Sequence, residues 1–404
     1  MANNHFVWPA HVPEALRWDH SLASFTGHSD DPIAVLTQLF DGPDVVYARE
    51  ISPHQQGWLI TRHALQKEAF LDYEYFTSSA KSGLGQMLGV DWRLLPLESN
   101  PPEHALYRQV LNPYLTPQRI AELEAQTRAN CDALIDQFAP RSECEFIEDF
   151  AIPFPTFIFL SLLGLPLDEA EQFLAWESGL LRGRSIEQRV ECGLGVMHYL
   201  QAFIAKQKDS PSTALLDGIV NAKVGGRDIT DDEILGLLYT LYLGGLDTVY
   251  STLGWIIRHI ARDHVLQQQL RDDPSLHARA VDEFIRLYGV VGTMRMVAKD
   301  FTFNGVDMKA GDRVLLPLFL AGRDPQAWDD AASFRLDRGE ASLSFASGPH
   351  VCVGRHLARL ELRTALGAML SRFSAISIAE GKDWAYHTAP VLGVDKLHLS
   401  LQVG

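Results

Sequence analysis

The sequence predicts a mainly α-helical protein with small β-sheets. Apolar residues recur at helical spacing along most of the chain, and the longest such pattern, from Thr230 to about Arg262, contains no proline. Strand-like patterns are short and few, and the clearest lie at 56–61, 301–303, 313–317 and 397–401. No linker, low-complexity run or internal repeat divides the chain. We therefore expect a single domain over residues 1–404, with a β-rich N-terminal part and an α-rich lobe.

The composition is that of a large acidic protein. Hydrophobic residues make up 47% of the chain, which is enough for a sizeable core. Asp and Glu total 51 and Lys and Arg total 35, so the formal net charge is −16. This charge repels phosphate backbones and makes a nucleic acid an unfavourable partner.

Two segments bear on a possible membrane attachment. Residues 1–9 show neither a secretory signal nor a membrane anchor. The apolar run 154–167 is too short to cross a bilayer and is interrupted by Pro155 and Pro166, so we expect a buried helix there. The sequence therefore predicts a cytoplasmic protein without a membrane partner.

Two helix starts are predicted in the N-terminal half. Paired prolines at 101–102 end an extended loop, after which His104 and Arg108 stand at i and i+4 on one helical face. Both side chains can donate hydrogen bonds to a carboxylate. A Thr-Pro pair then begins a long amphipathic helix, which we expect to run over 116–138.

The long central pattern begins with a strong start signal. Thr230 is a suitable N-cap, and Glu233, three residues later, completes a capping box. Between 234 and 257 the pattern is apolar nearly all round, so the helix should cross the protein interior.

The middle of this helix, 244–248, reads Gly-Gly-Leu-Asp-Thr. Two glycines weaken a helix, and burial of Asp247 and Thr248 adds a desolvation cost. Two interpretations remain open at this point. Either small residues are needed where two helices cross, or the helix opens locally and leaves room for a small ligand beside the acid and the hydroxyl.

The C-terminal half contains a charged pair and two strands. Glu283 and Arg286, at i and i+3, share a helix face and can form an ion pair. The strands at 301–303 and 313–317 are expected to be joined by glycine-containing turns.

The segment 344–355, Ser-Phe-Ala-Ser-Gly-Pro-His-Val-Cys-Val-Gly-Arg, is the most informative part of the chain. It places Cys352 just before a helical pattern, where unpaired backbone N–H groups favour a thiolate. Gly348 and Gly354 let the backbone approach a flat ligand closely, and Phe345 can shield the sulfur from water. The remaining cysteines are widely spaced, which favours reduced thiols over disulfides or a zinc site: Cys131, Cys144 and Cys192.

This segment resembles the proximal loop of the cytochrome P450 family, whose pattern is F-G-x-G-x-H-x-C-x-G. The chain matches that pattern at Phe345, Gly348, His350, Cys352 and Gly354, and it has Ala346 where glycine is usual. Other family motifs follow in the family's order: H-x-x-x-R at 104–108, the acid–alcohol pair at 247–248, E-x-x-R at 283–286, and polar segments at 321–325 and 334–338. The resemblance extends from about residue 8 to the C-terminus.

The resemblance implies a fold, a cofactor and its ligands. The fold would be a triangular helical prism with a long central helix over the haem and a proximal cysteine loop. The cofactor would be haem b (iron protoporphyrin IX), with the Cys352 thiolate as the iron ligand. Further cofactor-binding residues are implied by the same motifs: His104, Arg108, Arg295 and His350 at the propionates, and Phe345, Gly348 and Gly354 in the loop.

The resemblance also implies roles in catalysis and in stability. Gly244, Asp247 and Thr248 correspond to the oxygen-activating part of the family's central helix, where the acid and the alcohol handle protons for dioxygen. The Glu283–Arg286 pair would have a structural role and tie its helix to the segment 334–338. We expect a monooxygenase that hydroxylates an unactivated C–H bond.

Several segments look like the bacterial camphor-hydroxylase branch, among them 9–14, 154–155 and 244–249. That branch takes electrons from an iron–sulfur ferredoxin, which is reduced by an NAD(P)H-dependent flavoprotein. The chain shows no Gly-rich dinucleotide fingerprint after a strand, so we expect electrons to come from such partners. By resemblance, Arg108, Arg355 and Arg359 would form the docking face.

The expected substrate is a small hydrophobic molecule, and a monoterpenoid or norisoprenoid is the preferred class. By resemblance the pocket would be lined by 82–96, the central helix, 290–291 and 391–394. The individual residues expected there are mostly apolar: Trp92, Leu243, Val290, Val291 and Val394. The indole N–H of Trp92 can donate to a ketone or ether oxygen, but Trp92 is equally well interpreted as a packing residue on a mobile lid.

Two alternatives stay open. One is a peroxide-driven haem enzyme that needs no ferredoxin, and the intact Asp247–Thr248 pair argues against it. The other is a haem sensor or carrier without catalysis, which the same pair disfavours.

Overall fold

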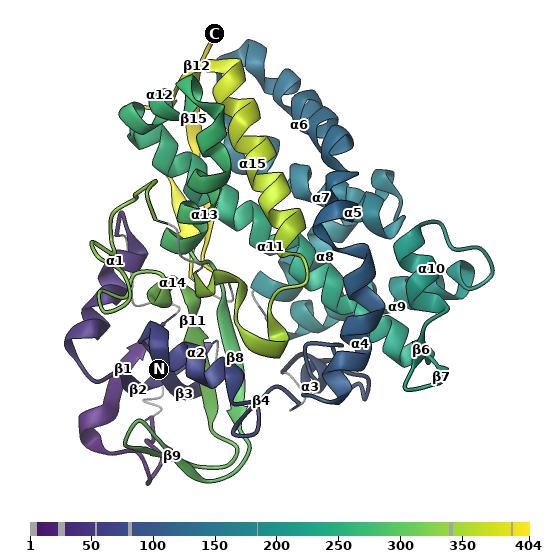
Figure 1. Ribbon diagram of the computed structural model, residues 1–404, viewed down its shortest axis with the longest axis vertical. Helices are drawn as coiled ribbons and strands as arrows, with labels where there is room; N and C mark the ends of the chain where they lie inside the picture. Colours follow the sequence, from purple (N-terminus) through teal and green to yellow (C-terminus); the bar gives the residue numbers. More distant parts are fainter. Residues whose placement is uncertain are drawn as a thin grey trace. The chain divides into compact units, whose positions relative to one another are not determined.

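The structure is a computed structural model (Figure 1), and it describes residues 6–22, 29–52, 55–79, 83–183, 185–338, 342–388 and 391–404. Helices predominate and the sheets are small, which confirms the predicted fold class. The chain divides into two compact units. Unit 1 comprises Met1–Ser78, Asp282–Val351 and His387–Leu392, and unit 2 comprises Ser79–Val281, Cys352–Tyr386 and Gly393–Gly404. The expectation of a single domain stays a prediction.

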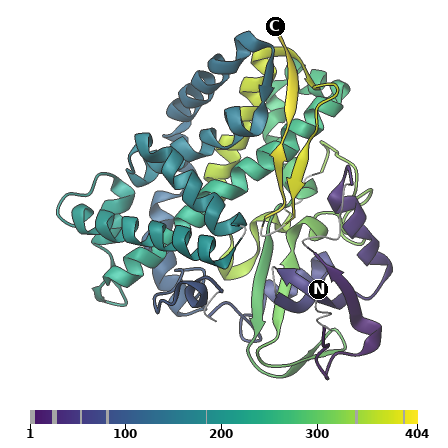
Figure 2. The same ribbon diagram turned by 180° about the vertical axis from the view of Figure 1, so that it is seen from behind.

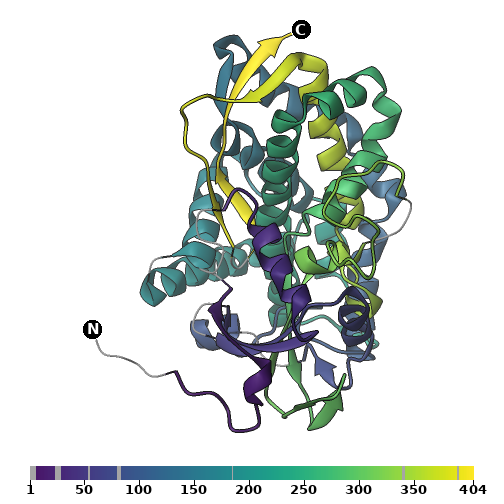
Figure 3. The ribbon, with the colours of Figure 1, turned by 90° about the vertical axis from the view of Figure 1, so that its left-hand side faces the viewer.

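Unit 1 is built around a mixed sheet. Its strands, in spatial order, are β1 (Arg17–Ser21), β2 (Val45–Ser52), β3 (Gln55–Ile60), β11 (Arg313–Pro317), β8 (Gly292–Val297) and β4 (Phe76–Thr77). β3 and β11 are parallel neighbours although they are far apart in the sequence, and Trp58 pairs with Val314 (Figure 1). Both side chains are fully buried, because aromatic and β-branched residues suit a pleated surface that is covered on its inner face. The edge strand β1 and its neighbour β2 are seen from another side in Figure 3.

Short helices and a hairpin complete unit 1. The helices are α1 (Pro32–Leu36), α2 (His63–Leu71) and α14 (Leu318–Ala321). The predicted strands at 56–61 and 313–317 are confirmed as β3 and β11. The connection expected between 301–303 and 313–317 is different, however, because β9 (Phe301–Phe303) pairs with an unpredicted strand, β10 (Val306–Met308). Three residues are too few to show an alternating pattern in the sequence, and Asn304 and Gly305 form the tight turn between them.

Unit 2 is organised around α11 (Asp231–Arg262), a helix of 32 residues. The predicted capping box is present, because Thr230 accepts from the Glu233 amide and Glu233 accepts from the Thr230 amide. Helices that contact α11 are α7 (Pro153–Leu163), α8 (Ala170–Arg182), α9 (Ile186–Gln207), α12 (His264–Asp272) and α15 (Arg355–Arg372). Most residues of α11 are buried, as the predicted all-round apolar character requires.

The other helices of unit 2 include α3 (Gly83–Leu88), α4 (Glu103–Leu111), α5 (Pro117–Ala121), α6 (Glu124–Phe138) and α10 (Ala214–Val220), and α13 (His277–Leu287) continues into unit 1. The prediction of one helix over 116–138 is wrong, since α5 and α6 are separate. The amide of Leu123 bonds to the carbonyl of Ile120 at 3.0 Å, and this tighter turn ends α5. The buried helix expected at 154–167 is α7, which ends at Gly164 with a positive φ of 64°.

Unit 2 also contains small sheets. β12 (Phe373–Ile378) and β15 (His398–Val403) run antiparallel, as the two yellow strands in Figure 2 show, and β5 (Glu143–Glu145) pairs with β15. The predicted C-terminal strand is thereby confirmed. The remaining strands form two pairs: β6 (Lys223–Val224) with β7 (Arg227–Asp228), and β13 (Ala385–His387) with β14 (Gly393–Lys396). Among the described helices, none combines the length and the apolar character that crossing a bilayer requires.

Candidate active site

The predicted site residues fall in both units. Unit 2 contains the cysteine, the central-helix residues and the H-x-x-x-R pair, whereas unit 1 contains the preceding part of the cysteine loop, Arg295 and the E-x-x-R pair.

Cys352 lies three residues before α15, as expected for a thiol near a helix N-terminus. Burial raises the pKa of the Cys352 thiol, while a hydrogen bond from the Gly354 backbone and the charges of Arg108, Arg355 and Arg359 act in the opposite direction. Arg355 also donates to the Cys352 carbonyl at 3.1 Å. A sulfur buried in this way ionises only when a strong positive partner, such as a metal ion, compensates the lost hydration. The surrounding arginines and the Gly354 amide then stabilise the thiolate further.

His104 and Arg108 lie on α4, one turn apart. His104 is buried, and burial lowers the pKa of the Arg108 guanidinium while the Cys352 charge opposes that shift. The Nε of Arg108 donates to Asn112 Oδ1 at 3.0 Å. Arg108 of this helix and Cys352 therefore lie within electrostatic range of one another, and their role in a common site stays a prediction.

The two glycines in the middle of α11 have different surroundings. A Cβ on Gly245 would lie 2.4 Å from the Phe159 ring of α7, so Gly245 serves a close helix crossing. A Cβ on Gly244 would meet nothing within 4 Å, and Gly244 is exposed although most residues of α11 are buried. The Thr248 hydroxyl donates to the Gly244 carbonyl at 3.0 Å. Gly245 therefore fits the interpretation of a helix crossing, and Gly244 fits the interpretation of space for a small ligand. The helix α11 itself continues through 244–248 without interruption.

Asp247 lies in a buried network that the sequence analysis did not foresee. Arg182 of α8 donates from Nη1 to Asp247 Oδ1 at 2.9 Å, and the Ser251 hydroxyl donates to the same oxygen at 3.4 Å. A second acid, Glu177 of α8, is also buried, with Oε2 4.0 Å from Arg182 Nη2. The available signal was weak, because Glu177 and Arg182 are ordinary charged residues of an amphipathic helix.

Arg295 of β8 is a buried guanidinium in unit 1. It is 5% exposed, its Nη1 donates only to the adjacent Met294 carbonyl at 2.8 Å, and its Nη2 has no hydrogen-bond partner among the described residues. Its guanidinium carbon lies 5.2 Å from the Phe70 ring centre. Burial lowers the pKa of Arg295 to about 10. A buried cation without an acidic partner fits an anionic group of a bound cofactor, such as a haem propionate.

The rest of the cysteine loop in unit 1 consists of two short turns. Gly348 has a φ of 66°, a backbone conformation that favours glycine, and a Cβ there would lie 3.0 Å from the end of the exposed Leu71 side chain. The Val351 amide bonds to the Gly348 carbonyl at 3.2 Å, which closes the turn that contains His350. Phe345 ends the preceding turn and is partly buried.

Glu283 and Arg286 form a buried pair in unit 1 with two hydrogen bonds of 2.7 Å. Arg286 also donates to backbone carbonyls of three residues: Gly322, Ala331 at 2.8 Å, and Ser333 at 3.0 Å. Glu283 accepts from the Arg335 amide at 2.9 Å and from Arg338 Nε at 3.0 Å. The pair therefore fixes the whole segment from 322 to 338.

The predicted pocket residues differ in how much surface they leave free. Trp92 packs on Tyr239 with ring centres 5.1 Å apart, and its indole nitrogen is buried without a hydrogen-bond partner among the described residues. Leu243 is partly buried. Val394 is fully buried and lies close to Gly254, so it is the least suited of the five to contact a substrate. Ser82, the first residue of the expected pocket segment, lies outside the described residues.

The other two pocket candidates belong to unit 1. Val290 is buried and its carbonyl accepts from the Leu392 amide at 2.8 Å. Val291 forms an isolated antiparallel bridge with Val391.

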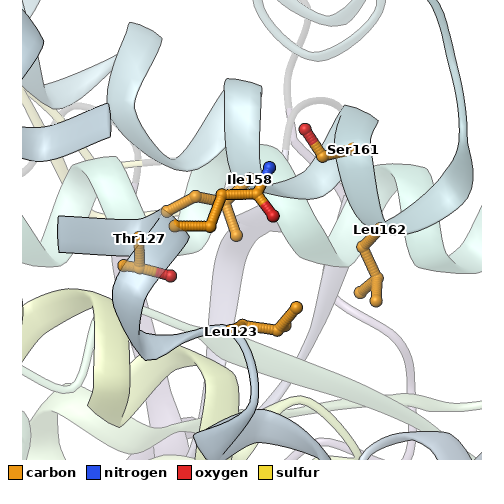
Figure 4. Close-up of a pocket in the computed structure, with 6 residues that line it drawn as sticks. Leu123, Thr127, Ile158, Ser161 and Leu162 are labelled. Atoms are coloured by element: carbon orange, nitrogen blue, oxygen red, sulfur yellow. The ribbon is translucent and has the colours of Figure 1, made fainter. Parts of the chain in front are cut away.

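A separate hollow of about 50 Å³ lies between α6 and α7 (Figure 4). It is lined by Leu123, Gln126, Thr127, Ile158, Ser161 and Leu162. None of these side chains is ionisable, and the hollow is not a candidate for the chemistry.

Comparisons with known proteins identify the family of the chain. The family described as Cytochrome P450 matches residues 183–399. The chain is 34% identical over 400 residues to a probable cytochrome P450 127A1 of Sinorhizobium fredii, covering 97% of this chain and 96% of that protein. It is 31% identical to a luteothin monooxygenase of Streptomyces thioluteus, covering 89% and 93%.

Solved structures agree as well. CYP101C1 matches with a TM-score of 0.89 at 29% identity, and CYP101J2 with a TM-score of 0.87 at 28%, each covering 98% of this chain and 100% of the other. These two represent the camphor-hydroxylase-like branch expected from the sequence. The chain therefore belongs to the cytochrome P450 family, and the protein is a monooxygenase with haem b as its cofactor.

Proposed function

We propose that this enzyme hydroxylates an unactivated C–H bond of a small hydrophobic substrate, preferably a monoterpenoid or norisoprenoid, with dioxygen and electrons from a ferredoxin. The observation that carries the proposal is the open space beside Gly244, whose carbonyl accepts from the Thr248 hydroxyl, in the middle of a largely buried apolar helix. Apolar surroundings suit a hydrophobic substrate, and a nearby hydroxyl can donate a proton during the reaction.

The haem-binding residues are proposed from the motifs together with their local surroundings. Bound haem supplies the reduction of dioxygen and the oxidation of the substrate. Cys352 would bind the iron, and the charges of Arg355, Arg359 and Arg108 would stabilise its thiolate. Gly354 and Gly348 let the backbone come near the cofactor, and Phe345 would shield the sulfur.

The family motifs assign the propionates to His104, Arg108, Arg295 and His350, and this assignment is kept as a proposal. The assignment of Arg295 has the most structural support, because its Nη2 has no hydrogen-bond acceptor among the described residues. A propionate would provide that acceptor, and its negative charge would raise the pKa of Arg295, which burial lowers.

Thr248 and Asp247 are proposed to move the protons. The Thr248 hydroxyl keeps its proton on the Gly244 carbonyl at rest, and rotation of its side chain would offer that proton to the open space. Asp247 has one oxygen bound to Arg182 and Ser251, and its Oδ2 has no partner among the described residues. That oxygen can accept and release a proton while the other holds the side chain in place.

The substrate class is proposed from the chemistry of Trp92 and its apolar surroundings. A buried indole N–H without an acceptor favours a ligand that carries one oxygen, such as a ketone or an ether. Leu243 and the apolar residues near Trp92 offer no hydrogen-bonding side chain to a second polar group of the substrate.

A ferredoxin is proposed as the electron donor. The chain carries a net charge of −16, so an acidic partner needs a local basic surface. Arg108, Arg355 and Arg359 lie within electrostatic range of Cys352 and can form one. The cytoplasm remains the expected location.

Reconstitution tests this proposal. The purified protein is titrated with a terpenoid panel while the spin-state shift of its Soret band is followed, and binders are then turned over with a ferredoxin, its reductase and NADH. We expect a shift for small monooxygenated terpenoids and a hydroxylated product. Turnover with hydrogen peroxide but not with ferredoxin would show a peroxide-driven enzyme instead, and binding without NADH consumption would show a sensor or carrier.

A further inference from the structure

A buried cluster of two carboxyls and one guanidinium joins α8 to α11 within unit 2. Arg182 Nη1 lies 2.9 Å from Asp247 Oδ1, and Arg182 Nη2 lies 4.0 Å from Glu177 Oε2. The side chains of Glu177 and Asp247 are 2% and 1% exposed, whereas that of Arg182 is 22% exposed. The two acids are therefore closed to water, and the cluster reaches solvent at the guanidinium.

One guanidinium cannot neutralise two carboxylates. With both acids ionised the cluster would bury a net negative charge, and a proton on one acid removes it. Burial and the nearby Asp247 charge raise the pKa of Glu177 to about 8, and Arg182 opposes this only in part. Because Asp247 keeps the short bond to Arg182, Glu177 is the acid that carries the proton near neutral pH.

Each acid also keeps one oxygen without a hydrogen-bond partner among the described residues, Glu177 Oε1 and Asp247 Oδ2. Buried carboxyl oxygens are almost always satisfied, so this pair needs an explanation. A protonated Glu177 has a donor, and Asp247 Oδ2 is an acceptor without a hydrogen-bond partner of its own among the described residues.

The other titratable groups around Glu177 do not compete for its proton. From α11, burial raises the pKa of Tyr242 and of Tyr250 well above the usual value, so both phenols stay neutral. From α9 comes the Cys192 thiol, whose pKa burial also raises. α7 carries no ionisable side chain. Asp247 is therefore the acceptor that the surroundings offer.

We propose that Glu177 stores the proton that Asp247 receives in each reaction cycle. The inference rests on the proposed role of Asp247 in proton handling. Glu177 acts through Asp247 and needs no contact with the substrate or the cofactor, so it is a positioning residue of the proton path.

The transfer conserves the charge of the cluster. The O–H bond of Glu177 breaks and an O–H bond forms on Asp247, so that one carboxyl gains the proton that the other loses. Asp247 becomes neutral and Glu177 becomes a carboxylate, so Arg182 exchanges one anionic partner for the other. After Asp247 has passed its proton on, the Glu177 carboxylate takes up one proton from solvent, which completes the cycle.

The pH dependence follows from the direction of the shift. Only protonated Glu177 can donate, so the path operates below its pKa of about 8 and is lost as the pH rises through that value.

The first experiment needs no turnover. Infrared difference spectra of the resting haem-loaded protein are recorded from about pH 6 to about pH 10 for the wild type, Glu177→Gln and the matched control Glu171→Gln, whose residue is exposed on the same helix. We expect a carboxylic-acid carbonyl band that disappears with a midpoint near 8, is lost in Glu177→Gln and persists in Glu171→Gln. A wild type without this band at low pH, or a band that survives Glu177→Gln, overturns the proposal.

The second experiment measures product formation against pH with the ferredoxin system. We expect the wild-type rate to fall over the range in which the band disappears, and Glu177→Gln to be about tenfold slower at neutral pH and insensitive to pH. Glu177→Asp, which keeps an acid, should regain part of the rate and its pH dependence. Equal pH profiles in the wild type and Glu177→Gln overturn the relay. A protein that titrates as expected but forms no product with any ferredoxin overturns the proposed function and with it the relay, but leaves the protonated Glu177 established.

Discussion

At the scale of single residues, Ala346 adopts a backbone conformation that is unfavourable for any residue with a side chain. Ala346 has a φ of 61° and a ψ of −170°, a region that only glycine occupies readily. The family pattern has glycine at this position, and the positive φ explains why. The substitution is tolerated because the cysteine loop is fixed on both sides, by the 2.6 Å bond from the Ala346 amide to Leu343 and by the turn at Gly348.

Ala346→Gly should raise the free energy of unfolding by about 1 kcal/mol, because the relieved strain exceeds the entropy that glycine adds to the unfolded chain. Urea denaturation of the haem-loaded protein measures this. The control is Ala358→Gly inside α15, where glycine should lower the stability by about 1 kcal/mol. A loss of stability in both variants would contradict the strain at 346.

Thr248→Ala should bind haem normally but direct electrons into hydrogen peroxide, because the hydroxyl that now bonds to the Gly244 carbonyl is lost. We expect the fraction of NADH that ends in product to fall about tenfold. Parallel measurement of NADH, product and peroxide checks it, with Thr248→Ser as the control that keeps the hydroxyl. Tight coupling in Thr248→Ala would refute the role assigned to Thr248.

At the scale of elements, α11 combines two requirements in adjacent residues. Gly245 meets Phe159, and Gly244 faces open space. The sequence pattern showed that this part of the helix was unusual, but it could not separate the two roles, because consecutive residues of a helix point in different directions that only the packing identifies.

The two glycines therefore provide a matched test. Gly245→Ala should lower the stability by about 1–2 kcal/mol, since its Cβ would overlap the Phe159 ring. Gly244→Ala should raise the stability by up to about 1 kcal/mol, because alanine favours the helix and meets no atom, yet it should slow turnover by narrowing the open space. Thermal unfolding and ferredoxin-driven turnover of both variants decide this. The reverse order of stability would be inconsistent with the packing.

The E-x-x-R element should be essential for the loop that it binds. Arg286→Ala would leave Glu283 buried without its main partner and several carbonyls between 322 and 333 without a donor. A loss of about 3–5 kcal/mol follows, and we expect no stable incorporation of haem. Arg335→Ala is the control, since its exposed side chain pairs with Asp337 and with no other acid among the ion pairs of the described residues. A soluble, haem-loaded Arg286→Ala protein would show that the network is dispensable.

At the scale of the whole molecule, local patterns were predictable and distant partners were not. The capping box at Thr230 and the strands at 313–317 and 397–401 depend on neighbouring residues, and the structure has them where the sequence places them. The Arg182–Asp247 bond joins residues 65 positions apart, and no periodicity encodes such a partner. The break between α5 and α6 was missed because the apolar spacing continues across it.

The candidate site divides in the same way. Residue types within a motif, such as Cys352 with its glycines, were visible in the sequence, and their chemistry followed from general principles. The neighbouring residues that alter the pKa and the hydrogen bonding of these side chains could be identified only from the fold. The buried state of Arg295 and the second acid at Glu177 belong to this group.

The central claim is that the Cys352 sulfur is the anionic ligand of the haem iron. Burial raises the pKa of the free thiol, so a thiolate at this position requires the metal. The most direct measurement is the absorption spectrum of the ferrous protein under carbon monoxide, compared between wild type and Cys352→Ser. We predict the long-wavelength Soret band of thiolate ligation in freshly prepared wild type and its absence in Cys352→Ser. A wild-type spectrum without that band would contradict the account.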